Sequence, residues 1–188
     1  MEKLMTGSRM LCSSRAAGLA LLIGLSTPAV QAETNDMILG KLRIAADFPC
    51  KPKRFKQVVG KTEAGEEILL TSLMCSQGDR TFSLSGTQYP EQALKSLSAD
   101  KILDSTLDNL RAQAHYTMRS SERTTHQGFA AIRMHFLDSK APPMEMARLS
   151  VLTNASIIAI GMTWPSSSGQ PSMLASFSGS LTIAPGKN

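Results

Sequence analysis

Three histidines are the residues of this sequence best suited to holding a metal ion. His115, His126 and His135 are separated by 11 and 9 residues, and these spacings match no compact ligand motif such as H-E-x-x-H. Neighbouring strands could still bring two of them together with Asp138 or Glu122. A metal- or small-ligand-binding module that uses these histidines is therefore our alternative hypothesis for the function.

Two other patterns carry possible chemistry. Ser98-Ala99-Asp100-Lys101 fits the S-x-x-K nucleophile motif of penicillin-binding proteins, but the sequence has no S-D-N, and Lys61-Thr62-Glu63 departs from K-T-G at its third place. A helix N-cap explains Ser98 better. Met144 and Met146 share one face of a predicted strand, which could suit copper(I) or simply fill a core. We expect no enzyme and no cofactor, and a small hydrolase is the least favoured reading.

The first 32 residues have the pattern of a secretory signal peptide. Lys3, Arg9 and Arg15 precede an apolar run of ten residues, Ala16–Leu25, which is short for a bilayer-spanning helix of about 20 residues. Val30-Gln31-Ala32 then supplies small residues at a cleavage site. We expect cleavage after Ala32, a periplasmic or secreted location, and no transmembrane segment in the mature chain.

The mature chain, residues 33–188, is predicted to be one domain. The full sequence has 188 residues, of which 42% are hydrophobic and 19% charged, enough for a single packed core. Residues 1–32 carry three basic residues and one acidic residue, so the mature part keeps 17 basic and 14 acidic residues. This small excess does not indicate a partner that is a nucleic acid.

Two cysteines remain after cleavage, Cys50 and Cys75. An even pair in an exported chain favours a disulfide. Cys50 follows the first strand of a predicted meander, and Cys75 ends the third. The ends of these two strands should lie at the same edge of the sheet, so we expect the two cysteines to meet. A redox or metal-binding thiol pair is the alternative, although the sequence has no C-x-x-C.

The marked charge feature is a group of five positive residues between positions 51 and 61, with no acidic residue among them. They are Lys51, Lys53, Arg54, Lys56 and Lys61. As an exposed patch they could bind an acidic protein or an anionic surface such as phospholipid head groups. Alternatively, they protect an edge strand against aggregation.

Hydrophobic periodicity predicts an α+β fold with an antiparallel sheet of about six to eight strands. Strands are expected at 38–48, 55–59, 68–75, 81–87, 115–124, 129–137, 146–153 and 156–164. Between them, residues 90–114 change to helical spacing and predict a long amphipathic helix, with Ser96 or Ser98 as its cap. A short C-terminal helix is expected over residues 171–178.

Three short motifs resemble the PsbP/Mog fold superfamily, especially its small exported bacterial members. They are Phe48-Pro49-Cys50-Lys51-Pro52, Gly128-Phe129-Ala130-Ala131 and Phe177-Ser178-Gly179-Ser180-Leu181. The resemblance implies a PsbP-like α/β sandwich in which the prolines set a turn, the glycine allows close packing and the late phenylalanine fills the core. It also implies a non-enzymatic protein, and it transfers no binding residue.

These observations lead to one expected function. The protein should be an exported, non-enzymatic binding or accessory protein of the cell envelope. It should act through contacts with an envelope protein or an anionic surface, using the positive residues at 51–61.

Overall fold

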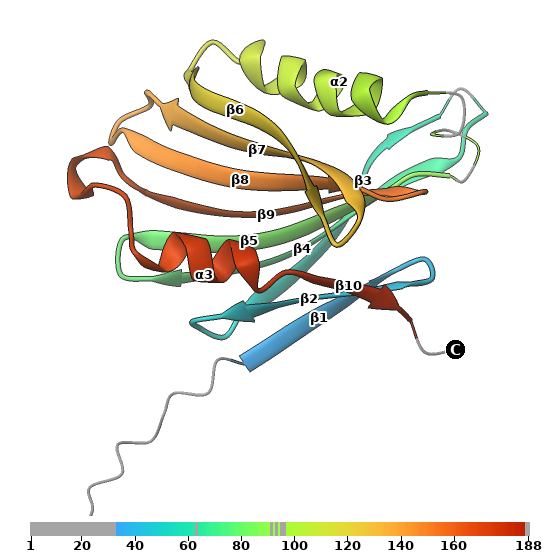
Figure 1. Ribbon diagram of the computed structural model, residues 1–188, viewed down its shortest axis with the longest axis horizontal. Coiled ribbons are helices and arrows are strands. Elements are labelled where there is room, and N and C mark those ends of the chain that lie inside the picture. Colours follow the sequence, from blue (N-terminus) through green and yellow to red (C-terminus); the bar gives the residue numbers. More distant parts are fainter. Residues whose placement is uncertain (1–32, 63, 91, 93, 95–96, 187–188) are drawn as a thin grey trace, which may run out of the picture. The chain divides into compact units, whose positions relative to one another are not determined.

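Ten antiparallel strands in two sheets make up most of the described part of the computed structural model (Figure 1). The structure describes residues 33–188 except 63, 91, 93, 95–96 and 187–188, so the predicted signal peptide lies outside the described residues. The described residues belong to one compact unit. Among the described residues, no helix has both the length and the apolar character needed to cross a bilayer.

The elements follow one another in the order strands, helix, strands, helix, strand. They are β1 (Glu33–Leu39), β2 (Leu42–Phe48), β3 (Lys53–Lys61), β4 (Glu67–Gln77), β5 (Arg80–Gln88), α2 (Ala99–Arg111), β6 (Tyr116–His126), β7 (Phe129–Asp138), β8 (Met144–Leu152), β9 (Ser156–Pro165), the 3-10 turn η1 (Ser166–Ser168), α3 (Met173–Gly179) and β10 (Thr182–Pro185).

The strands pair in two separate sheets. The larger sheet has seven strands in the order β3-β4-β5-β9-β8-β7-β6, and the smaller has three in the order β1-β2-β10. Every pair is antiparallel. The prediction of an α+β fold with antiparallel strands is confirmed, but the expectation of a single sheet is wrong.

The predicted first strand, 38–48, is in fact a hairpin. The chain turns at Gly40 and Lys41, and Leu39 pairs with Leu42. Gly40 has a φ of +58°, a left-handed conformation that favours glycine in tight turns. Neither this turn nor β10, which pairs with β2, was predicted from the sequence.

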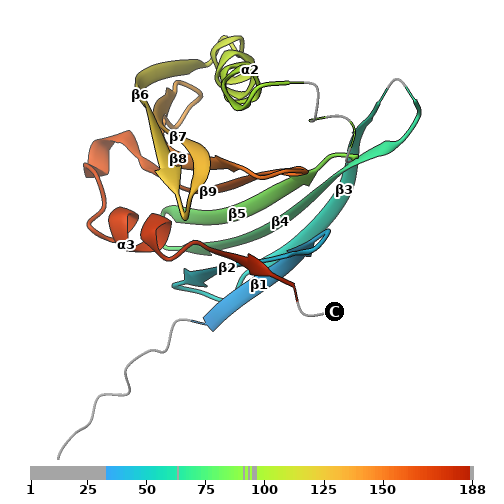
Figure 2. The ribbon, with the colours of Figure 1, turned by 45° about the vertical axis from the view of Figure 1, so that its right-hand side comes forward.

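The two faces of the seven-stranded sheet are covered differently. The first, which we call the core face, packs against the three-stranded sheet and α3 (Figure 2). Its centre is Phe177, whose ring meets Phe48 at 5.3 Å and Phe82 at 5.1 Å in edge-to-face geometry. The late phenylalanine therefore fills the core, as predicted.

The second face, which we call the α2 face, is covered only in part. Ser98 caps α2 by accepting a hydrogen bond from the Lys101 amide at 3.3 Å, and Leu103 and Leu107 pack on Met134 and neighbouring apolar residues of β7. The helix contacts β6, β7 and β8, and it lies on the opposite side of the sheet from β1 and β2 (Figures 1 and 2). Parts of β3, β4 and β5 are left accessible on this face.

The predicted disulfide is present and joins the two sheets. Cys50, in the loop after β2, bonds to Cys75 on β4, with the Cα atoms 5.9 Å apart. The reason we gave for their proximity was wrong in one respect. Cys50 follows a strand of the three-stranded sheet, so the bond connects separate layers rather than two strands of one meander.

Candidate binding surface

The five positive residues at 51–61 lie on both sides of one edge strand. Lys53 and Phe55 point to the α2 face, because they pair with Met74 and Ser72, which alternate with the core residues of β4. Arg54 and Lys56 lie on the opposite side. The predicted patch is therefore divided between two faces, with Lys51 in the preceding loop and Lys61 at the far end of β3.

The strand that carries these residues is exposed along its length. Every residue of β3 except Gly60 is exposed, and within the described part of the chain no strand pairs with its outer edge. Three apolar side chains share this exposure: Phe55 at 54%, Val58 at 49% and Val59 at 48%. Exposed apolar groups on an edge strand are unusual, because such an edge can recruit another strand.

Part of the positive group is fixed inside the molecule. The Arg54 Nη2 atom donates a hydrogen bond to the Asp36 carbonyl oxygen of β1 at 2.5 Å. This contact ties the edge strand to the three-stranded sheet. No ion pair recorded among the described residues includes Lys51, Lys53 or Lys56, so their charges are available to a partner.

Two shallow hollows lie beside β3 on the α2 face. One, of about 330 Å³, is lined by Phe55, Gln57, Leu70, Ser72 and Met74. The other, of about 420 Å³, lies among Lys51, Lys53, Phe55 and Met74. Two of the positive residues therefore border an accessible apolar surface, an arrangement that suits a partner with both apolar and acidic groups.

A larger cavity, of about 530 Å³, lies where the two sheets meet. Leu39 and Phe129 supply apolar walls, and Gln88, Tyr89 and Lys41 supply polar groups. Burial raises the pKa of Tyr89, so its phenol stays neutral and can donate a hydrogen bond. The size is within the range of small-molecule sites.

The structure does not bring the three histidines together. His115 precedes β6 and His126 ends it, so the two are about 36 Å apart along the strand at 3.3 Å per residue. The His126 Nε2 atom lies 2.9 Å from the Leu181 carbonyl oxygen. No group of three metal-ligating side chains occurs within the described residues.

The third histidine has a different acidic neighbour from the two we expected. His135 Nε2 lies 2.9 Å from the Glu145 Oε2 atom, and the imidazole stacks on Trp164 with ring centroids 5.6 Å apart. Arg119 approaches the other Glu145 oxygen at 3.6 Å. The expected partners lie elsewhere, since Glu122 pairs with Arg133 and Asp138 accepts a hydrogen bond from the Lys140 amide.

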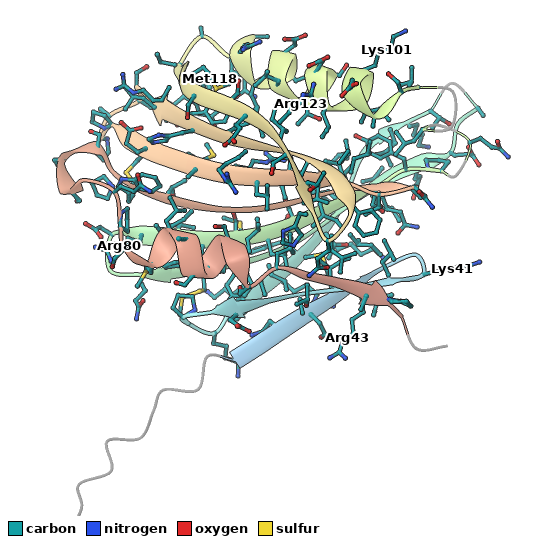
Figure 3. All side chains as sticks on the ribbon, viewed as in Figure 1. Lys41, Arg43, Arg80, Lys101, Met118 and Arg123 are labelled. Atoms are coloured by element: carbon teal, nitrogen blue, oxygen red, sulfur yellow. A yellow bond between two sulfur atoms is a disulfide. The ribbon has the colours of Figure 1, made fainter. Side chains whose placement is uncertain are left out.

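The S-x-x-K residues form a helix cap. Ser98 binds the backbone amide of Lys101, and the Lys101 side chain projects from α2 away from the sheet (Figure 3). Arg123 reaches from β6 toward the helix (Figure 3) and pairs with Asp104. These contacts explain the serine as a structural residue.

Comparisons with known proteins give remote structural likenesses. No protein-family model and no curated protein sequence matches this chain. Cyanobacterial PsbP (CyanoP) from Synechocystis sp. PCC 6803 is similar with a TM-score of 0.48 and 9% identity, over 86% of this chain and 99% of that one. PA94, a Pseudomonas aeruginosa protein of unknown function, is similar with a TM-score of 0.41 and 9% identity, over 72% of this chain and 85% of that one. Likenesses this remote identify no family and assign no function.

The residues behind the predicted family resemblance have structural roles here. Phe48 and Phe177, from two of the motifs, touch each other in the core. Gly128, in the third, lies in the β6–β7 turn with a φ of +82°, next to Gln127 at +51°. A Cβ atom at Gly128 would meet nothing within 4 Å. The expectation that this glycine allows close packing is therefore wrong, because its role is the positive φ of the turn.

Proposed function

We propose that this protein is an exported, non-enzymatic binding protein that captures an acidic partner protein of the cell envelope along strand β3. Cleavage after Ala32 would leave the described domain in the periplasm or outside the cell. The disulfide between Cys50 and Cys75 supports this location, because such bonds persist in oxidising compartments. Membership of the PsbP/Mog superfamily is part of the same proposal.

The observation that carries the proposal is the combination of properties found on one strand. β3 ends the seven-stranded sheet, is exposed on both sides, and carries apolar side chains between positive ones. An extended segment of another protein can add to such an edge through backbone hydrogen bonds, while alternate side chains provide specificity. Acidic side chains on that segment would face Lys53 on one side and Lys56 on the other.

The competing explanation is that the lysines only prevent edge-to-edge association. The two explanations predict opposite results when all five positive residues are replaced by glutamine. If β3 binds an acidic partner, capture from envelope extract is lost and the variant stays monomeric. If the positive residues only prevent edge-to-edge association, partner capture persists and the variant self-associates, which sedimentation velocity would detect.

Charge reversal on each side of the strand would identify the side that the partner uses. One variant combines Lys51→Glu with Lys53→Glu on the α2 side, and the other combines Arg54→Glu with Lys56→Glu on the core side. Lys101→Glu with Arg111→Glu on α2 is the matched control, since both residues are exposed. Partner capture that is weakened equally by the control and by the β3 variants would contradict the proposal.

A further inference from the structure

Arg148 is a positive residue in the middle of the sheet, and no acidic side chain of the described residues forms an ion pair with it. It lies on β8, opposite Met134 of β7 and Gly161 of β9. Its Nε atom donates a hydrogen bond to the Ser150 Oγ atom at 3.0 Å. None of the ion pairs formed within the described part of the chain includes it, and the residue is half-buried.

This arrangement leaves the positive charge of Arg148 available to an anion. Burial lowers the pKa of Arg148, and the neighbouring Tyr116 acts in the opposite direction. A guanidinium nevertheless stays protonated in proteins. A partly desolvated cation without a counter-charge is stabilised when an anion binds to it through charge-assisted hydrogen bonds.

A small recess lies beside the Arg148 side chain on the α2 face. Its volume is about 60 Å³, room for about two water molecules or one carboxylate group. Small side chains of β5 and β9 form most of its lining, namely Ser83, Ser85, Ala159, Gly161 and Thr163. A Cβ atom at Gly161 would lie 2.8 Å from the Ala147 carbonyl oxygen, so the sheet has no room for a side chain there.

The recess borders the apolar hollow near the edge of the sheet. Ser85, which lines the recess, pairs in register with Ser72, which lines the 330 Å³ hollow with Phe55 and Leu70. From β8 to β4 the surface crosses three strand spacings, or about 14 Å at 4.8 Å each. A cationic pocket is thus followed by an accessible apolar surface.

We propose that the α2 face binds a long-chain carboxylate, that is, a fatty acid. The carboxylate occupies the recess and pairs with the terminal nitrogens of Arg148. The alkyl chain lies across β5 and β4 against Leu70, Phe55 and Met74. This site goes beyond the proposed capture of a protein along β3, since Arg148 lies four strands from that edge.

Calorimetric titration of dodecanoate into the chain of residues 33–188, which contains every described strand and helix, tests the proposal. We expect saturable binding that Arg148→Met weakens tenfold or more, because a hydrogen bond to a charged group is lost. Arg133→Met is the matched control, since Arg133 lies on the neighbouring strand β7 with an exposed side chain, and it should bind like the parent. Dodecanol, which has no charge, should bind at least tenfold more weakly than dodecanoate.

Two further measurements show whether a loss of binding comes from the site or from misfolding. Without ligand, Arg148→Met should melt at the same temperature as the parent or higher, because it removes a half-buried charge that no ion pair within the described residues compensates. If that variant does not fold, Ser85→Leu fills the recess while keeping Arg148, and it should weaken binding to a similar extent. No dodecanoate binding, equal binding by both arginine variants, or equal binding of dodecanol would overturn the proposal. If the protein does not bind dodecanoate but does bind an acidic peptide, the recess belongs to a protein partner instead.

Discussion

Strand β5 contains both kinds of surface that this sheet presents. Phe82, Leu84 and Gly86 point to the core face and are buried, whereas Ser83 and Ser85 between them point to the α2 face and are half-buried. The core face excludes water with large apolar side chains. On β5, the α2 face carries small hydroxyl side chains, which leave room above them.

We therefore expect the core face to determine the stability of the sheet and the α2 face to bind ligands or partners. On the core face, the three-stranded sheet, α3 and the disulfide all contribute contacts to one cluster. On the α2 face, the apolar cluster stops at β6–β8 and the remaining strands carry the hollows. Substitutions should therefore change stability on one face and ligand or partner binding on the other.

The largest contrast should come from one substitution made on each face. Phe177→Ala removes a buried ring that touches Phe48 and Phe82, and we expect it to lower the free energy of unfolding by about 3–5 kcal/mol. Phe55→Ala, on the exposed edge, should cost less than about 1 kcal/mol. Urea unfolding of both variants gives the comparison. Similar losses would mean that Phe55 belongs to a core after all.

The disulfide should make the next largest contribution. It closes a loop with a sequence separation of 25 residues, so replacing Cys50 and Cys75 by serine should cost about 3 kcal/mol, chiefly by freeing the unfolded chain. Urea unfolding with and without reductant measures the effect. Reductant should destabilise the parent and leave the double serine variant unchanged. An unchanged parent would show that the bond contributes no net stability.

A smaller effect should separate two neighbouring residues of β5. A Cβ atom at Gly86 would overlap the Leu39 side chain of β1, so Gly86→Ala should cost about 1–3 kcal/mol by overpacking the space between the sheets. Ser85→Ala, one residue away on the other face, should change the free energy of unfolding by less than about 0.5 kcal/mol. Adding Leu39→Ala to Gly86→Ala should show coupling in a double-mutant cycle. Additive losses would mean that the sheets are not in direct contact there.

Features that depend on local pattern could be predicted from the sequence. Alternating side chains located β5 and β7–β9, helical spacing located α2, and the cysteine count indicated the disulfide. The long-range arrangement could not be predicted in the same way. A charge pattern along 51–61 does not show that neighbouring residues face opposite sides of an edge strand, because that depends on the pairing of β3 with β4.

Arg148 illustrates the same limit at the candidate ligand site. In the sequence, the one sign of this site is that Arg148 occupies the same side of the β8 strand pattern as Met144 and Met146. The recess beside it is formed by Ser85 and Gly161 on β5 and β9, and only the order of strands brings these together. No spacing along the chain encodes that contact.

The smallest predicted effect distinguishes a structural serine from a chemical one. Ser98→Ala removes the cap of α2 and should cost about 1 kcal/mol, whereas Ser98→Asp, which can still accept the Lys101 amide hydrogen, should restore most of that loss. Lys101→Ala should change little, because its exposed side chain forms no ion pair recorded among the described residues. Thermal unfolding of the three variants tests this order. Equal stability of Ser98→Ala and the parent, or no recovery with aspartate, would mean that the cap does not explain the serine.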